Sequence, residues 1–258
     1  MPSNPFEPVL LIEERGPVRV VRMNLPDSLN ANRPDLHDAL IAVWKHISTN
    51  DPDARAVVLT GAGRAFSAGG DMKDFTLLWD DTTRRKRELD QARQLVLEML
   101  DFPLPLVAAV NGPAVGLGAS LAFGCDLVVI AENAYLADPH VAIGLTAGDG
   151  GAATWPFFMS MPRVKEYLFT GDKLTAEVAV QLGIANRLVP KGESVEEAVA
   201  LASRLANMPP QAIRSTKRAV NIHLRRAIEG ILDYALEAEY HSFDSPEHQA
   251  AVNGFLGR

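Results

Sequence analysis

A glycine-bearing bend in residues 110–126 suggests the first chemistry. Gly116 and Gly118 follow the turn-forming residues Asn111, Gly112 and Pro113, and the residues after Gly118 favour a helix. The first amides of a helix have no partner within it, and the helix dipole adds positive potential at the same end. We therefore expect this bend to stabilise an oxyanion.

A second loop looks complementary to the first. Residues 55–60 read as a strand, and the glycine-rich residues 61–71 follow it. Two amides from separate loops that point at one oxygen can hold a thioester enolate or a tetrahedral anion, and each donor is worth about 2.7–4 kcal/mol of barrier. The two loops together predict an oxyanion hole.

At these residues the sequence resembles the enoyl-CoA hydratase/isomerase (crotonase) superfamily. The resemblance implies an acyl-CoA thioester whose carbonyl oxygen lies between the amides of Gly70 and Leu117. Coenzyme A then enters as part of the substrate, so no separate cofactor and no metal are expected. The similar stretches are residues 24–26, 29–31, 65–71, 110–126, 174–177 and 183–189.

The resemblance also assigns substrate-binding positions. They include Asn30 and Ala31 beside the coenzyme, and also Ala68, Asp71 and Gly116. Lys217 and Arg258 are candidate contacts of the coenzyme phosphates, with ordinary surface charge as the alternative. Phe75, Leu78 and Trp79 would line the acyl pocket within a mobile segment, residues 71–83. A surface loop with buried anchors explains that segment equally well.

The sequence departs from the family where proton transfer takes place. Hydratases of this family use two glutamates, and Ser120 and His140 stand at those positions here. His140 suits proton transfer near neutral pH, and Ser120 could position water. Asp149 lies between glycines in a loop that borders the site in the family, although turn chemistry also explains an aspartate there. We take these three as the candidate catalytic residues.

Double-bond isomerisation or atypical hydration is the reaction that these residues favour, because adding water needs both a positioned acid and a positioned base. His140 could instead activate water, which leaves an acyl-CoA hydrolase or a C–C bond-cleaving enzyme as an alternative. A non-catalytic acyl-CoA-binding protein is a third interpretation.

Composition argues against several other classes of protein function. A chain of 258 residues with a formal charge of −7 can bury a large core and does not suit nucleic-acid binding. The single cysteine, Cys125, allows no internal disulfide. We expect no secretory signal, because residues 1–5 show no basic region followed by an apolar segment. We expect no membrane span, because the apolar runs are shorter than about 18 residues, and a cytoplasmic location by default.

Patterning predicts an α/β fold. Residues 9–14 and 18–23 read as a hairpin, residues 34–50 as a helix with solvated His37 and His46, and residues 105–110 and 127–131 as buried strands. Strands that alternate with single helices indicate a spiral of strand-strand-helix units, which is also the family's fold. Arg84 to Arg87 are expected on a solvated helix face, with coenzyme phosphates as the alternative contact.

From Arg163 onward we expect helices only. They cover residues 163–170, 175–182, 195–207, 211–224, 229–243 and 246–256. The resemblance implies that residues 1–190 form the core with the acyl-CoA site. It also implies that residues 191–258 form a helical region that builds a homotrimer, or a hexamer made of two trimers.

Overall fold

The computed structural model describes residues 4–257, which form an α/β fold. A six-stranded sheet has the order β1-β2-β3-β4-β6-β9, and a smaller sheet has the order β5-β7-β8. In the larger sheet β1 and β2 form the predicted antiparallel hairpin, and the other neighbours are parallel. The strands are β1 (Leu10–Arg15), β2 (Val18–Met23), β3 (Ala56–Gly61), β4 (Leu106–Val110), β5 (Ala114–Val115), β6 (Leu127–Ala131), β7 (Tyr135–Ala137), β8 (Leu174–Thr175) and β9 (Arg187–Val189).

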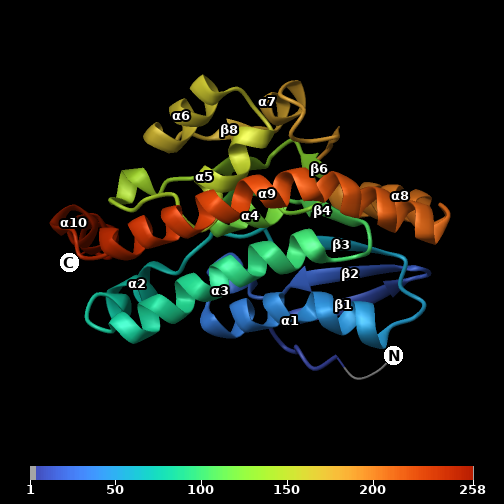
Figure 1. The fold of residues 1–258 in the computed structure, drawn as a ribbon, viewed down its shortest axis with the longest axis horizontal. Helices are drawn as coiled ribbons and strands as arrows, with labels where there is room; N and C mark the ends of the chain where they lie inside the picture. Colours follow the sequence, from blue (N-terminus) through green and yellow to red (C-terminus); the bar gives the residue numbers. More distant parts are fainter. Residues whose placement is uncertain (1–3, 258) are drawn as a thin grey trace.

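Helices surround the sheets, and the long helix α9 runs beside α3 across the molecule (Figure 1). The helix α10 lies at the C-terminal end of α9 and contacts α2. The helices are α1 (Pro34–Asn50), α2 (Met72–Leu78), α3 (Thr82–Asp101), α4 (Leu117–Phe123), α5 (Gly151–Thr154), α6 (Met161–Thr170), α7 (Ala176–Gln181), α8 (Ser194–Ala206), α9 (Pro210–Ser242) and α10 (Pro246–Phe255).

The larger sheet is covered on both faces. In β4, Ala108 joins the core cluster that contains Leu40 of α1, whereas Val107 joins the cluster that contains Leu201 of α8. Every residue of β4 is buried. This confirms the prediction that the apolar run before the glycine bend is a strand without a solvent face.

The spiral is confirmed by how successive strands alternate between the two sheets. The chain passes from β4 to β5 and into α4, then from β6 to β7. In each pair the first strand belongs to the larger sheet and the second to the smaller one. A bridge between Ser67 and Ala114 ties the loop after β3 to the same small sheet.

The C-terminal helices differ from the prediction in one respect. Residues 211–224 and 229–243 are not two helices, because α9 is continuous from Pro210 to Ser242. Ile228 and Leu232 pack with Ala92 and Val96 of α3, so the buried stripe of α9 continues through the expected break. Packing against α3 thus overrides the local helix-break signal.

Two further expectations about local structure were wrong. Residues 71–83 are not a loop, because Asp71 accepts a hydrogen bond from the Lys73 amide and begins α2, and Asp81 caps α3 at Arg84 in the same way. The chain after Arg163 is not only helical, since β9 adds the last strand to the larger sheet. Within residues 4–257, no helix has the length and the apolar character needed to cross a bilayer.

The segment 191–258 is closely tied to the rest of the chain. Its helix α8 contacts β2, β3, β4 and β6, and α9 contacts α3 and α5. The division at residue 190 and the oligomerising role of these helices stay predictions.

Candidate active site

The glycine bend leaves the Leu117 amide, at the start of a helix, without a partner in residues 4–257. The bend passes through β5 into α4, and Gly116 adopts a φ of 52°, which favours glycine. The Gly116 amide donates to the carbonyl of Ala137 at 2.9 Å. Leu117, the first residue of α4, has no acceptor for its amide within residues 4–257. Its N–H is thus free to bind an oxygen at the positive end of the helix.

The loop after β3 offers a second such amide at Gly70. Asn30 holds this loop in shape, because its Nδ2 donates to the carbonyls of Ala62 and Ala65. The carbonyl of Gly69 accepts from the Asn32 amide at 2.7 Å, but the Gly70 amide donates to no acceptor in the described part of the chain.

The two loops lie against each other. The Val115 amide donates to the Ser67 carbonyl at 2.9 Å. A Cβ on Gly118 would approach that same carbonyl to 2.5 Å, so only glycine allows α4 to begin this close to the loop. Gly70 and Leu117 line one cavity of about 60 Å³. The predicted convergence of the two loops is therefore present.

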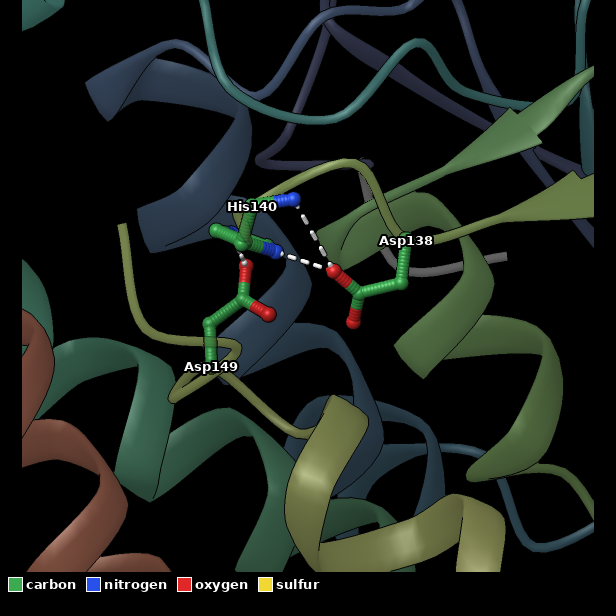
Figure 2. A group of neighbouring side chains, drawn as sticks. All are labelled: Asp138, His140 and Asp149. Atoms are coloured by element: carbon green, nitrogen blue, oxygen red, sulfur yellow. Dashed lines mark hydrogen bonds and ion pairs between the residues drawn. The ribbon is translucent and has the colours of Figure 1, made fainter. Parts of the chain in front are cut away.

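A buried histidine between two carboxylates borders this cavity (Figure 2). The Nδ1 atom of His140 lies 2.5 Å from Oδ1 of Asp138, and its Nε2 atom lies 3.6 Å from Oδ2 of Asp149. The backbone amide of His140 also donates to Oδ1 of Asp138. Asp138 follows β7, and Asp149 lies in the loop before α5, so two separate segments hold the imidazole.

The charges of this cluster are interdependent. Burial by itself lowers the pKa of the His140 imidazole, but Asp138 and Asp149 outweigh burial and raise it well above 6.5. Burial raises the pKa of Asp149 to about 6, although the positive charge of His140 acts in the opposite direction. At neutral pH the cluster therefore contains an imidazolium ion beside the ionised carboxylate of Asp149.

Glu239 also reaches this cavity, although it was not among the predicted site residues. It belongs to α9, is 4% exposed, and lines the cavity together with His140 and Asp149. Burial raises its pKa to about 8; the charge of His140 opposes this shift, while Asp149 and Asp138 add to it. One signal was present in the sequence: a glutamate continues the apolar stripe that contains Leu232 and Leu236.

Several predicted site residues lie at this cavity and others do not. Phe75 and Leu78 line it together with Gly70, Leu117, His140 and Asp149. Gly116 backs His140, since a Cβ there would lie 3.4 Å from the imidazole. Within the described residues, the cavity lining omits Ser120, Asn30, Ala31, Ala68, Asp71, Trp79 and Lys217.

The omitted side chains have structural contacts instead. Ser120 is buried, and a Cβ on Gly150 would lie 2.6 Å from its hydroxyl, so it packs beneath the loop that carries Asp149. The ammonium group of Lys217 lies 2.7 Å from Asp126 and donates to the Leu104 carbonyl. Contact between Lys217 and coenzyme phosphates stays a prediction, and Arg258 lies outside the described residues.

Two expectations about charged side chains were wrong. His37 is not solvated; it is 4% exposed and lines the cavity, and burial lowers its pKa to about 4. Arg85 is not on a solvated face, because it is fully buried and donates to the carbonyls of Leu78, Trp79 and Tyr240. Arg85 therefore ties the end of α2 to the end of α9.

The cluster does not present a convincing metal site. Ligand atoms of Asp138, His140 and Asp149 lie within 4.8 Å of one another. However, the two carboxylates approach opposite nitrogens of one imidazole, and Nδ1 is already engaged by Asp138. A single ion would have to break that contact, so the residues suit proton transfer better than metal binding.

Known proteins resemble this chain over nearly its whole length. The sequence profile of a family described as Enoyl-CoA hydratase/isomerase matches residues 13–258. A short-chain-enoyl-CoA hydratase from Clostridium acetobutylicum is 31% identical over 248 residues, which cover 96% of this chain and 94% of that protein. A crotonyl-CoA hydratase from Syntrophomonas wolfei is 28% identical over 253 residues, with the same two coverages of 96% and 94%.

A solved structure resembles the chain in the same way. It is an enoyl-CoA hydratase/isomerase from Mycobacterium paratuberculosis, which is 48% identical and has a TM-score of 0.91. The match covers 95% of this chain and 98% of that chain.

Proposed function

The chain belongs to the enoyl-CoA hydratase/isomerase family, and from this premise we propose that it shifts the double bond of a 3-enoyl-CoA thioester by proton transfer. One observation carries the proposal. Two amides that have no partner in residues 4–257 line the same cavity as the buried His140 and Asp149. The amides would stabilise an enolate, and the cluster would move the proton that forms it.

In this proposal the thioester oxygen accepts hydrogen bonds from the amides of Gly70 and Leu117. Both amides are fixed by the fold before substrate arrives, so little reorganisation is needed as negative charge develops. Each donor would contribute about 2.7–4 kcal/mol to lowering the barrier for removal of the α proton.

Asp149 is the proposed proton acceptor. Its pKa of about 6 lies closer to neutral pH than that of an ordinary aspartate, yet leaves it ionised at pH 7. His140 would keep it ionised through its positive charge, and Asp138 would hold the imidazole by its Nδ1 atom. Ser120, which packs under the Asp149 loop, would act only by supporting that loop.

The acyl group would need more room than the present cavity offers. About 60 Å³ is far less than the roughly 300–1,000 Å³ of an ordinary small-molecule pocket. The Phe75 ring fills the space above Gly70, where a Cβ would meet it at 2.5 Å. We propose that Phe75 moves aside when an acyl chain binds and then forms a wall of the acyl pocket with Leu78.

A saturated acyl-CoA in D₂O tests the proposal, because exchange of its α protons requires enolate formation but no complete reaction. Wild type is expected to exchange these protons and to convert a 3-enoyl-CoA into the 2-enoyl isomer, and Asp149→Asn is expected to do neither. If wild type binds acyl-CoA but does neither, and also leaves the thioester intact, the protein is a non-catalytic acyl-CoA binder.

Hydration is the second candidate, and the names of the relatives favour it. Both relatives described above are named hydratases, and hydration would begin from the same oxyanion hole. Loss of the 2-enoyl absorbance with formation of a 3-hydroxyacyl-CoA would indicate hydration. Release of free coenzyme A or of a shortened acyl chain would instead indicate hydrolysis or C–C cleavage.

Assembly and location are proposed on the same basis. We propose a homotrimer or a hexamer, since large apolar side chains of α6 and α9 are exposed in the single chain, among them Phe169, Val220 and Ile222. Mass measurement of the native protein tests this. A cytoplasmic location without nucleic-acid or membrane partners stays a prediction.

A further inference from the structure

Glu239 is a buried acid, and a purely structural role for it would require hydrogen-bond partners for its carboxyl group. It is 4% exposed, and its Oε2 atom has no hydrogen-bond partner within residues 4–257. A buried carboxyl oxygen without a partner is costly to a fold, and each such group in a native structure calls for an explanation. Leu232 and Leu236 on the same helix face show that an apolar side chain would suit this stripe.

The loop that carries Asp149 closes directly over Glu239. A Cβ on Gly148 would lie 2.4 Å from Oε2 of Glu239 and 2.6 Å from the Ala235 carbonyl. Only glycine lets the loop approach α9 this closely. The approach brings Asp149, His140 and Glu239 to one cavity with Gly70 and Leu117.

We propose that Glu239 is the proton donor of this site and works with Asp149 as the proton acceptor. This inference rests on the proposed function and adds the second group that double-bond migration requires. Two carboxyl groups at one cavity can divide the two proton transfers when one of them is neutral and the other is ionised.

The proposed reaction accounts for every proton and electron pair that it moves. The carboxylate of Asp149 removes the α proton of the 3-enoyl thioester, and the electron pair becomes a dienolate held by the Gly70 and Leu117 amides. The carboxyl group of Glu239 then gives its proton to the γ carbon, the carbonyl re-forms, and the double bond lies between the α and β carbons. The proton on Asp149 afterwards passes to the Glu239 carboxylate, which restores both groups.

The titration of the cluster supports this division of roles. Burial raises the pKa of Glu239 to about 8, so the group is largely protonated at neutral pH, whereas Asp149 with a pKa of about 6 is largely ionised. The other titratable groups at the cavity are His37 of α1, which is neutral, and Glu88 of α3, which pairs with Arg84. Rates are therefore expected to fall below about pH 6 and above about pH 8.

The experiment compares Glu239→Gln with wild type in two assays on the full-length protein. Glu239→Gln is expected to isomerise 3-enoyl-CoA on the order of 10²–10⁴-fold more slowly in kcat, with little change in KM. It is also expected to keep α-proton exchange of a saturated acyl-CoA, because Asp149 alone removes and returns that proton. The matched control is Glu237→Gln on the same helix, since Glu237 is exposed and pairs with His241 at the surface.

Each outcome separates the two proposals. Wild type that neither exchanges nor isomerises overturns the proposed function itself. An active wild type with an equally active Glu239→Gln variant overturns the inference alone. A folded variant that loses exchange and isomerisation in equal measure also overturns it, because Glu239 would then only position its neighbours. If the residual activity of Glu239→Gln no longer falls above pH 8, that result supports the inference.

Discussion

The Nδ1 atom of His140 lies 2.5 Å from Oδ1 of Asp138, and neither side chain exposes more than 8% of its surface. This contact sets the orientation of the imidazole, because a ring whose Nδ1–H is held by a carboxylate must present Nε2 on its other side. Asp149 lies on that side, 3.6 Å from Nε2. Asp138 is therefore a positioning residue for the group that faces the proposed proton acceptor.

Asp138→Asn should lower the pKa of the His140 imidazole. The variant removes a nearby opposite charge, and such a charge shifts a pKa by about 1–3 units. NMR titration of the imidazole signals measures this, with Asp172→Asn at an exposed position as the control. An unchanged His140 titration in Asp138→Asn would contradict the geometry described above.

Glu239→Gln should raise the stability of the protein at alkaline pH. The folded-state pKa of Glu239 is about 8 and lies above its ordinary value of 4.5, so between these values the folded chain keeps a proton that the unfolded chain has lost. Stability due to this group therefore falls as pH rises from about 4.5 to 8. The glutamine side chain of the variant cannot ionise, so the variant does not lose this stability as pH rises.

Thermal unfolding at two pH values measures this effect. At pH 9 the Tm of Glu239→Gln is expected to exceed that of wild type by several degrees, and at pH 4.5 the difference should be small. Glu237→Gln should follow wild type at both values. A Glu239→Gln variant less stable than wild type at pH 9 would show that the ionised carboxylate contributes to the fold.

Arg85→Met should destabilise the fold, because it leaves several buried carbonyls without a donor. Arg85 donates to Leu78, Trp79 and Tyr240, and it also pairs with Asp244 at 2.8 Å. We expect a loss of at least about 3 kcal/mol in the free energy of unfolding, since three carbonyls lose their donor and each unsatisfied buried acceptor costs about 1–3 kcal/mol.

Urea denaturation gives that free energy, and Arg87→Met is the control. Arg87 is exposed and lies 3.6 Å from Asp38, a surface pair worth about 0–1 kcal/mol. Equal losses in the two variants would mean that Arg85 does not hold α2 against α9.

Local sequence signals predicted the parts of the site that depend on backbone conformation. The apolar run of β4 and the glycines that follow it predicted a strand, a turn and a helix start, and all three are present. Such features are decided within a few residues of the chain, so pattern and turn chemistry suffice to find them.

The missed features depend on contacts between distant segments. Glu239 becomes a site residue only because α9 passes beneath the Gly148 loop, and Arg85 is buried only because α9 ends beside α2. His37 was expected in solvent but borders the cavity, since the α1 face that carries it is covered by other segments. Composition and periodicity of one segment do not contain this information.

The proposal as a whole depends on the free amide of Leu117, which can be removed without removing the helix. Leu117 is the first residue of α4, where proline lacks only an amide that has no partner in the helix. Leu117→Ala is the matched control, because it also shortens the buried side chain but keeps the N–H group. Circular dichroism and acyl-CoA binding verify that both variants fold.

The most direct measurement is the rate of α-proton exchange of a saturated acyl-CoA in D₂O by these two variants. An oxyanion hole that includes the Leu117 amide predicts that Leu117→Pro exchanges on the order of 10²–10³-fold more slowly than Leu117→Ala. Equal exchange rates in two folded, acyl-CoA-binding variants would contradict it.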